Sequence, residues 1–133
     1  MKLGRIVFEI YRDFAPIAGD NFVRLCRGER GLSYKGSTFY WIAPGYACMG
    51  GNITRKGSSQ ETSVYGGCFK DEGHLLRFAG PGVISTFNFK KGRNSSRFMI
   101  TFRELTTQNE RFVVFGRVIR TLKVLEMVRK KKN

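Results

Sequence analysis

Hydrophobic and polar residues follow two different periods near the start of the chain. Ile6, Phe8 and Ile10 recur at every second position, which is the pattern of a β-strand with one face toward a core. Apolar residues then recur every three or four positions between Pro16, which suits the first turn of a helix, and Gly28, which suits its stop. The sequence therefore predicts a strand followed by an amphipathic helix.

The rest of the chain is predicted to form short strands between glycine-rich loops, followed by one more helix. Aromatic and β-branched residues concentrate in five segments, at residues 38–42, 46–49, 83–87, 98–101 and 112–119. Residues 57–82 are expected to be mostly loop, and a predicted final helix has the apolar members Leu122, Leu125 and Val128. Many short strands with few helices favour a β-barrel or a sandwich, and the pattern alone does not choose between them.

The composition indicates one folded domain that spans residues 1–133. The chain contains 41% hydrophobic residues and twelve Phe, which is enough to bury a single core. Cys26, Cys48 and Cys68 are too few and too widely spaced for a disulfide framework, and with His74 they lack the close spacing of structural zinc ligands. We expect free thiols in a reducing compartment, with no metal and no cofactor.

Two segments bear on where the protein is found. Met1-Lys2 leads directly into the first strand pattern, without the apolar core of a signal peptide. Residues 36–54 carry no charge, but Pro44 and the glycines around it would disrupt a membrane helix. We therefore expect no membrane span and an intracellular location, in the cytoplasm or the nucleus.

The chain is strongly basic. It has 24 Lys and Arg against 10 Asp and Glu, a formal net charge of +14 at pH 7, and such a small domain attracts polyanions. The polyanion-binding residues that we predict form two clusters: Lys90, Lys91 and Arg93 in the first, and Arg129, Lys130, Lys131 and Lys132 in the second. RNA, DNA and acidic protein surfaces are all suitable partners for these clusters.

The segment from Tyr34 to Tyr46, which is followed by Gly50-Gly51, carries the clearest motif. Further segments resemble those of one protein family and follow the family's order, at residues 3–10, 21–26, 69–72, 80–85, 96–100 and 113–118. Along nearly its whole length the chain resembles cyclophilins, which are peptidyl-prolyl cis-trans isomerases. The resemblance implies a mainly β fold, an antiparallel β-barrel capped by two α-helices. We expect the barrel to lack the family's first and last strands, which would leave sheet edges for a partner or a longer chain to cover.

The resemblance also implies a groove for proline-containing peptides. Its residues in this chain are Trp41, Tyr46, Met49, Phe87, Asn88, Arg97, Met99 and Phe112. Trp41 stands where cyclophilins carry the catalytic arginine, and Met49 stands where a glutamine holds that arginine. Tryptophan offers a single neutral donor, so the resemblance implies a proline pocket without the polar machinery that acts on the amide.

Three functions remain open from the sequence. The first is a cyclophilin-like pseudoenzyme, catalytically weak or inactive, that serves as a basic protein-interaction or assembly subunit. The second is an active isomerase in which Arg97, on a strand that lines the family site, supplies the missing guanidinium. The third is an RNA-associated module that binds through the loop from Lys90 to Arg97 and the basic tail.

Overall fold

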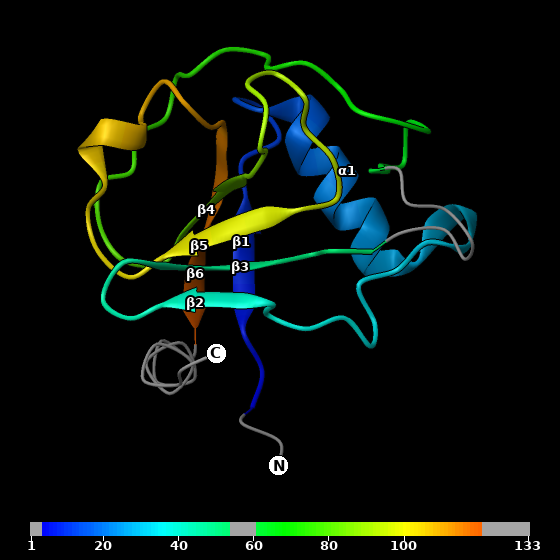
Figure 1. Ribbon diagram of the computed structural model, residues 1–133, viewed down its shortest axis with the longest axis horizontal. Coiled ribbons are helices and arrows are strands. Elements are labelled where there is room, and N and C mark those ends of the chain that lie inside the picture. Colours follow the sequence, from blue (N-terminus) through cyan, green and yellow to red (C-terminus); the bar gives the residue numbers. More distant parts are fainter. Residues whose placement is uncertain (1–3, 54–60, 121–133) are drawn as a thin grey trace.

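One six-stranded antiparallel sheet forms the framework of the structure, a computed structural model that describes residues 4–53 and 61–120 (Figure 1). The strand order across the sheet is β1-β6-β4-β5-β3-β2. The strands are β1 (Val7–Ile10), β2 (Trp41–Ala43), β3 (Ala47–Gly50), β4 (Val83–Thr86), β5 (Phe98–Thr101) and β6 (Val114–Arg120). Six short strands in one antiparallel sheet confirm the prediction of a mainly β fold.

The predicted first helix is present as α1 (Pro16–Arg27). It ends at Gly28, which has a left-handed backbone with φ of 79° and donates its N–H to the carbonyls of Arg24 and Leu25. The start of the helix has no cap from its own first residues. Instead both carboxylate oxygens of Glu72 accept backbone N–H bonds, from Ile17 at 2.8 Å and from Ala18 at 2.7 Å. A loop more than fifty residues away in sequence thus supplies the acceptors for the free donors at this helix end.

The main core lies between α1 and the inner face of the sheet. Phe22 is its centre, with its ring 5.5 Å from Phe8, 5.4 Å from Phe98 and 5.3 Å from Phe115. The first two contacts are edge-to-face, an arrangement that aromatic pairs prefer. These rings come from β1, α1, β5 and the long strand β6, so the core fixes the helix against the sheet.

The sheet is not closed within the described residues, which agrees with the expectation of a barrel that lacks the family's first and last strands. β1 and β2 are the two ends of the strand order, and no strand among residues 4–53 and 61–120 pairs with their outer edges. Of the two predicted helices, α1 is described, whereas Leu122, Leu125 and Val128 lie outside the described residues. The strands expected to complete the family barrel are therefore not part of this sheet.

Several strand limits differ from their predictions. The strand expected at residues 38–42 is β2, which starts only at Trp41; its partner β3 ends at Gly50 and leaves residues 38 and 39 without a strand residue opposite them. The strand expected at 112–119 begins at Val114. Two short 3-10 helices, Glu29–Gly31 and Thr106–Gln108, were not predicted, since three residues are too few to show a period.

Candidate functional site

The register of the sheet places three of the predicted groove residues in one row. Trp41 on β2 lies opposite Met49 on β3, Met49 lies opposite Met99 on β5, and Met99 lies opposite Ser85 on β4. Directly opposed residues in an antiparallel sheet project from the same face. This row follows the outer face, away from the core that Phe22 organises.

A second apolar cluster covers this outer face. Four predicted groove residues belong to it as buried members: Met49, Phe87, Met99 and Phe112. Tyr46 packs against the cluster as a partly buried residue. We call these five residues and their neighbours the groove cluster. Its other buried members are Ala47, Phe78, Leu105 and Val114.

Phe78 and Leu105 are the groove-cluster members that the sequence reasoning missed. The backbone N–H of Phe78 donates to Asn109 Oδ1 at 2.7 Å, and the N–H of Leu105 donates to the carbonyl of Phe78 at 3.0 Å. These bonds join the segment before β4 to the loop before β6. Phe78 lies in a stretch predicted to be loop, where only its apolar character among glycines and charged residues could have indicated a buried position.

Phe87 fills part of the groove with a large ring. The position resembles one that is occupied by a small alanine in cyclophilins. Here the ring is 9% exposed and lies 5.3 Å from Phe112 and 5.1 Å from Phe89 between ring centroids. The apolar floor of the groove is thus well packed with side chains of the protein itself.

Trp41 lies on the edge strand β2 and is 40% exposed. Its neighbour across the strand pair is Met49, which is buried and carries no hydrogen-bond donor. The two opposed side chains are therefore an indole and a thioether.

Arg97 is held by three groups. Its Nε lies 3.3 Å from Glu61 Oε1, and its guanidinium lies 5.3 Å from the ring centroid of Tyr40 and 5.1 Å from that of Phe89. The side chain is only 16% exposed. An arginine between two rings and a carboxylate has a fixed position and differs from a solvated surface arginine.

Asn88 is fully engaged inside the protein. Its side-chain amide donates to Asn94 Oδ1 at 2.9 Å, and its own Oδ1 accepts from Arg111 Nη1. Arg111 also donates to the backbone carbonyl of Asn88 at 3.2 Å and lies 4.6 Å from the ring centroid of Phe112. Asn94 in turn donates to Asp71 Oδ1 at 2.8 Å. This network is a second feature that the sequence reasoning missed. Arg111 directly precedes Phe112, but its hydrogen-bond partner Asn88 lies 23 positions away, so no local pattern joins the two residues.

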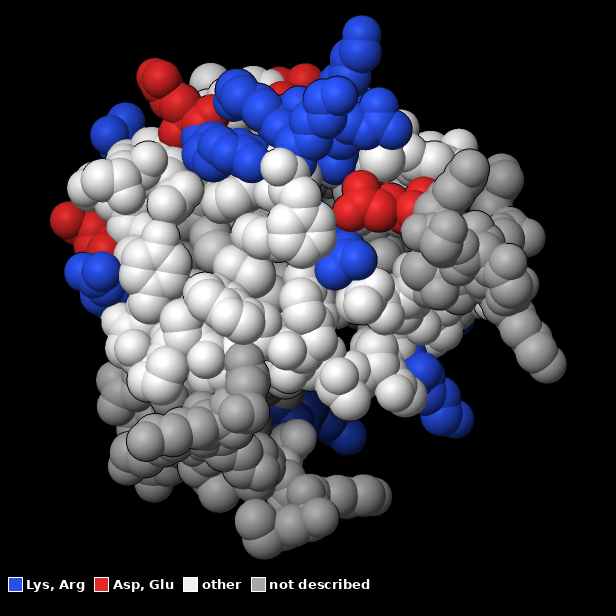
Figure 2. Space-filling model, in the orientation of Figure 1, with Lys and Arg blue, Asp and Glu red and all other residues white. Residues whose placement is uncertain are grey.

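The basic residues of the loop between β4 and β5 are exposed. Lys90, Lys91 and Arg93 all reach solvent, although Lys91 also donates to the carbonyl of Glu110 at 2.6 Å and lies 3.6 Å from Asp71. Figure 2 shows Lys and Arg gathered along the upper edge of a face whose centre is largely uncharged. The second predicted cluster, Arg129, Lys130, Lys131 and Lys132, lies outside the described residues.

Neither a metal-binding cluster nor a membrane-spanning helix is found in the described residues. In residues 4–53 and 61–120, no group of three His, Cys, Asp or Glu side chains is arranged to hold a metal ion. In the same part of the chain, no helix has the length and apolar character needed to cross a membrane.

Burial raises the pKa of the Cys48 thiol to about 12, so this cysteine is a protonated core residue at neutral pH.

A comparison with protein families matches the chain to the family described as cyclophilin type peptidyl-prolyl cis-trans isomerase/CLD. The match covers residues 1–133. It agrees with the mainly β sheet and with the helix packed on its inner face. The chain belongs to the family of cyclophilin-type peptidyl-prolyl cis-trans isomerases.

Proposed function

We propose that this domain is a cyclophilin-fold binding module that isomerises prolyl bonds weakly or not at all, and that serves as a basic subunit of a protein assembly. The observation that carries this proposal is the pair Trp41 and Met49, opposite each other at the position of the family's arginine and the glutamine that holds it.

Prolyl isomerisation needs a positioned donor. Amide resonance sets a barrier of about 18–20 kcal/mol, and a catalyst lowers it by stabilising the twisted amide. Trp41 offers one neutral N–H from a partly exposed edge strand, and no side-chain hydrogen bond holds it within residues 4–53 and 61–120. Loss of one positioned donor reduces a rate by about 10²–10³, so a weak residual rate is compatible with the proposal.

Arg97 is poorly placed to replace the missing donor. Moving its guanidinium into the groove would break the ion pair with Glu61 and the contacts with Tyr40 and Phe89. Asn88 is equally committed, because both its amide nitrogen and its amide oxygen are bonded within the protein. The polar groups beside the groove therefore stabilise the fold, and what remains for a ligand is the apolar surface.

The experiment is a magnetisation-exchange NMR assay on a short Ala-Pro peptide with the native chain. We expect exchange far slower than with an ordinary cyclophilin at equal concentration. The Arg97→Gln variant should leave the rate unchanged, as should Arg27→Gln, a matched charge control at the end of α1. Native exchange at the rate of an ordinary cyclophilin would refute the proposal, and its loss in Arg97→Gln alone would assign catalysis to Arg97.

One observation favours RNA as a second candidate ligand. Phe89 is 68% exposed and directly precedes the exposed Lys90 and Lys91. Exposed aromatic rings beside cations can stack single-stranded bases while the cations neutralise phosphates. Fluorescence anisotropy with labelled oligouridine tests this. We expect Phe89→Ala to weaken binding and higher salt to weaken it further, and binding that is indifferent to both would remove this candidate.

A further inference from the structure

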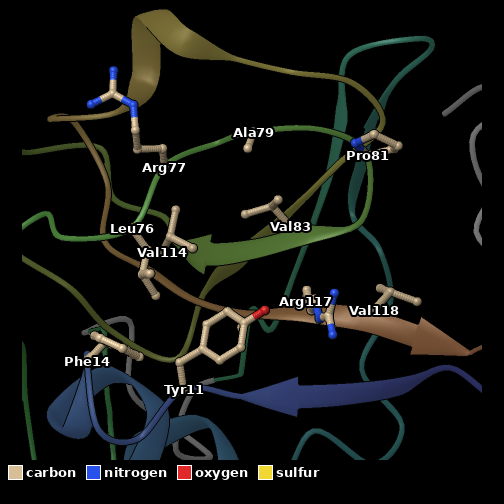
Figure 3. Close-up of a pocket in the computed structure, with 11 residues that line it drawn as sticks. Tyr11, Phe14, Leu76, Arg77, Ala79, Pro81, Val83, Val114, Arg117 and Val118 are labelled. Atoms are coloured by element: carbon tan, nitrogen blue, oxygen red, sulfur yellow. The ribbon is translucent and has the colours of Figure 1, made fainter.

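A cavity of ≈520 Å³ lies on the outer face of the sheet, next to the groove cluster (Figure 3). The turn after β1, the segment before β4, and the strands β4 and β6 surround it. Its apolar walls include Phe14, Leu76, Pro81, Val83 and Val114. The volume falls within the range of pockets that bind small ligands or single side chains, roughly 300–1,000 Å³.

The polar groups that line this cavity are hydrogen-bond donors of positive or neutral charge. They are the guanidinium groups of Arg77 and Arg117 and the hydroxyl of Tyr11, and no Asp or Glu is among the lining residues. Figure 3 shows the Tyr11 hydroxyl directed toward Arg117, while Arg77 lies at the opposite rim with its guanidinium pointing outward. The cavity therefore combines apolar walls with a rim that attracts an anion.

Arg117 is held in place at this rim. It lies opposite Glu9 on β1 and opposite Val83 on β4. Its Nε donates to Glu9 Oε1 at 3.0 Å, which leaves its two terminal amino groups without a partner in the described part of the chain. Burial, the largest influence, raises the pKa of Tyr11, as do the charge of Glu9 and a hydrogen bond to it, so the hydroxyl is protonated at neutral pH and shares the Glu9 carboxylate with Arg117.

Phe14 adds an uncovered apolar surface on the other side. Its side chain is 53% exposed although it lines the cavity, and it belongs to the turn between β1 and α1. A bulky apolar group in the cavity would cover this ring together with the valines of β4 and β6, which removes apolar surface from water.

We propose that this cavity, the Tyr11–Arg117 pocket, binds a segment of a partner protein in which a bulky apolar side chain is adjacent to a glutamate. The apolar side chain fills the cavity against Val83 and Val114, and the carboxylate bonds to the terminal amino groups of Arg117. Charge complementarity favours this occupant, because two guanidinium groups and no carboxylate line the pocket of a chain with a net charge of +14. The pocket is separate from the position of Trp41, so the inference does not rest on the proposed function.

The test is fluorescence anisotropy with a labelled, C-terminally amidated octapeptide that carries one phenylalanine between two glutamates, in a background of glycine and serine. Arg117→Gln and Arg77→Gln should each weaken binding about 1.5-fold to fivefold, the range of exposed charge pairs. Ala79→Phe places a ring in the cavity from an exposed lining position and should abolish binding. The charge-matched control Arg27→Gln should have no effect.

Two further peptides separate the contributions of shape and charge. Replacing both glutamates with glutamine, or the phenylalanine with alanine, should each weaken binding, and raising the salt from 50 to 300 mM should weaken only the glutamate peptide. Thermal melts monitor folding, because Arg117→Gln also removes the ion pair with Glu9. Absence of binding to the native chain, retained binding in Ala79→Phe, or an equal loss in Arg27→Gln would each overturn the inference. The isomerase assay reports separately on the groove.

Discussion

Restoring the catalytic arginine alone should not restore an ordinary cyclophilin. The relevant change is Trp41→Arg, made with and without Met49→Gln. In the native protein Trp41 lies opposite Met49, so a new guanidinium at position 41 would meet a thioether that cannot hold it. We expect the single variant to gain less than about tenfold in rate, whereas the double variant gains about 10²–10³, the value of one positioned donor.

The structure also indicates what these changes cost in stability. Trp41 is 40% exposed, so it buries roughly 100 Å² of apolar surface, worth at most about 2.5 kcal/mol. The methylene stem of an arginine would cover part of the same surface, which lowers the loss to about 1–2 kcal/mol. Met49 is buried, and a glutamine there costs about 1–2 kcal/mol unless it bonds to the new arginine. A domain with typical stability of about 5–15 kcal/mol remains folded.

The assay is exchange NMR on an Ala-Pro peptide, reported as the rate at equal protein concentration, with thermal melts of every variant. Trp41→Phe is the matched control, because it keeps an aromatic ring and adds no donor. If the single Trp41→Arg variant is as active as the double variant, the side chain at position 49 does not position the guanidinium and the reasoning fails. If neither variant gains activity while both stay folded, the packed ring of Phe87 and not the missing donor limits the rate.

Three further predictions concern the framework of the site. Glu72→Gln removes one of two acceptors at the start of α1 and should lower the melting temperature by roughly 3–6 °C, for about 1 kcal/mol, in a thermal melt with Glu104→Gln as the exposed control. Gly116→Ala would place its Cβ 2.5 Å from the carbonyl oxygen of Glu9, so it should destabilise the domain by about 1–3 kcal/mol in urea, whereas Gly67→Ala, with open space around it, should be neutral. The pKa of Cys48 is raised to about 12 in the folded state, from near 9 in the unfolded chain. Its contribution to the free energy of unfolding is therefore complete below pH 9 and is lost as the pH rises toward 12, by at most about 1.4 kcal/mol per pH unit. Urea titrations between pH 8 and 10.5 should show this slope, and Cys48→Ala should reduce it; an unchanged slope would contradict the assignment.

Local patterns in the sequence determined much of the fold. The alternation of Ile6, Phe8 and Ile10 predicted β1, and the interval between Pro16 and Gly28 predicted α1. Both periods depend only on residues a few positions apart. The motif around Trp41 and the other matching segments also indicated the family, and five of the eight predicted groove residues belong to the outer-face cluster or pack against it. These inferences depend on short intervals along the chain, and the sequence contains that information directly.

The tertiary structure decided the features that join distant segments. The cap that Glu72 provides for α1 and the fixed position of Arg97 against Glu61 both depend on contacts between segments that are far apart in sequence. The same is true of the bond between Arg111 and Asn88 and of the pocket beside Tyr11. No local period encodes such contacts, since they arise only when strand order and register bring the segments together.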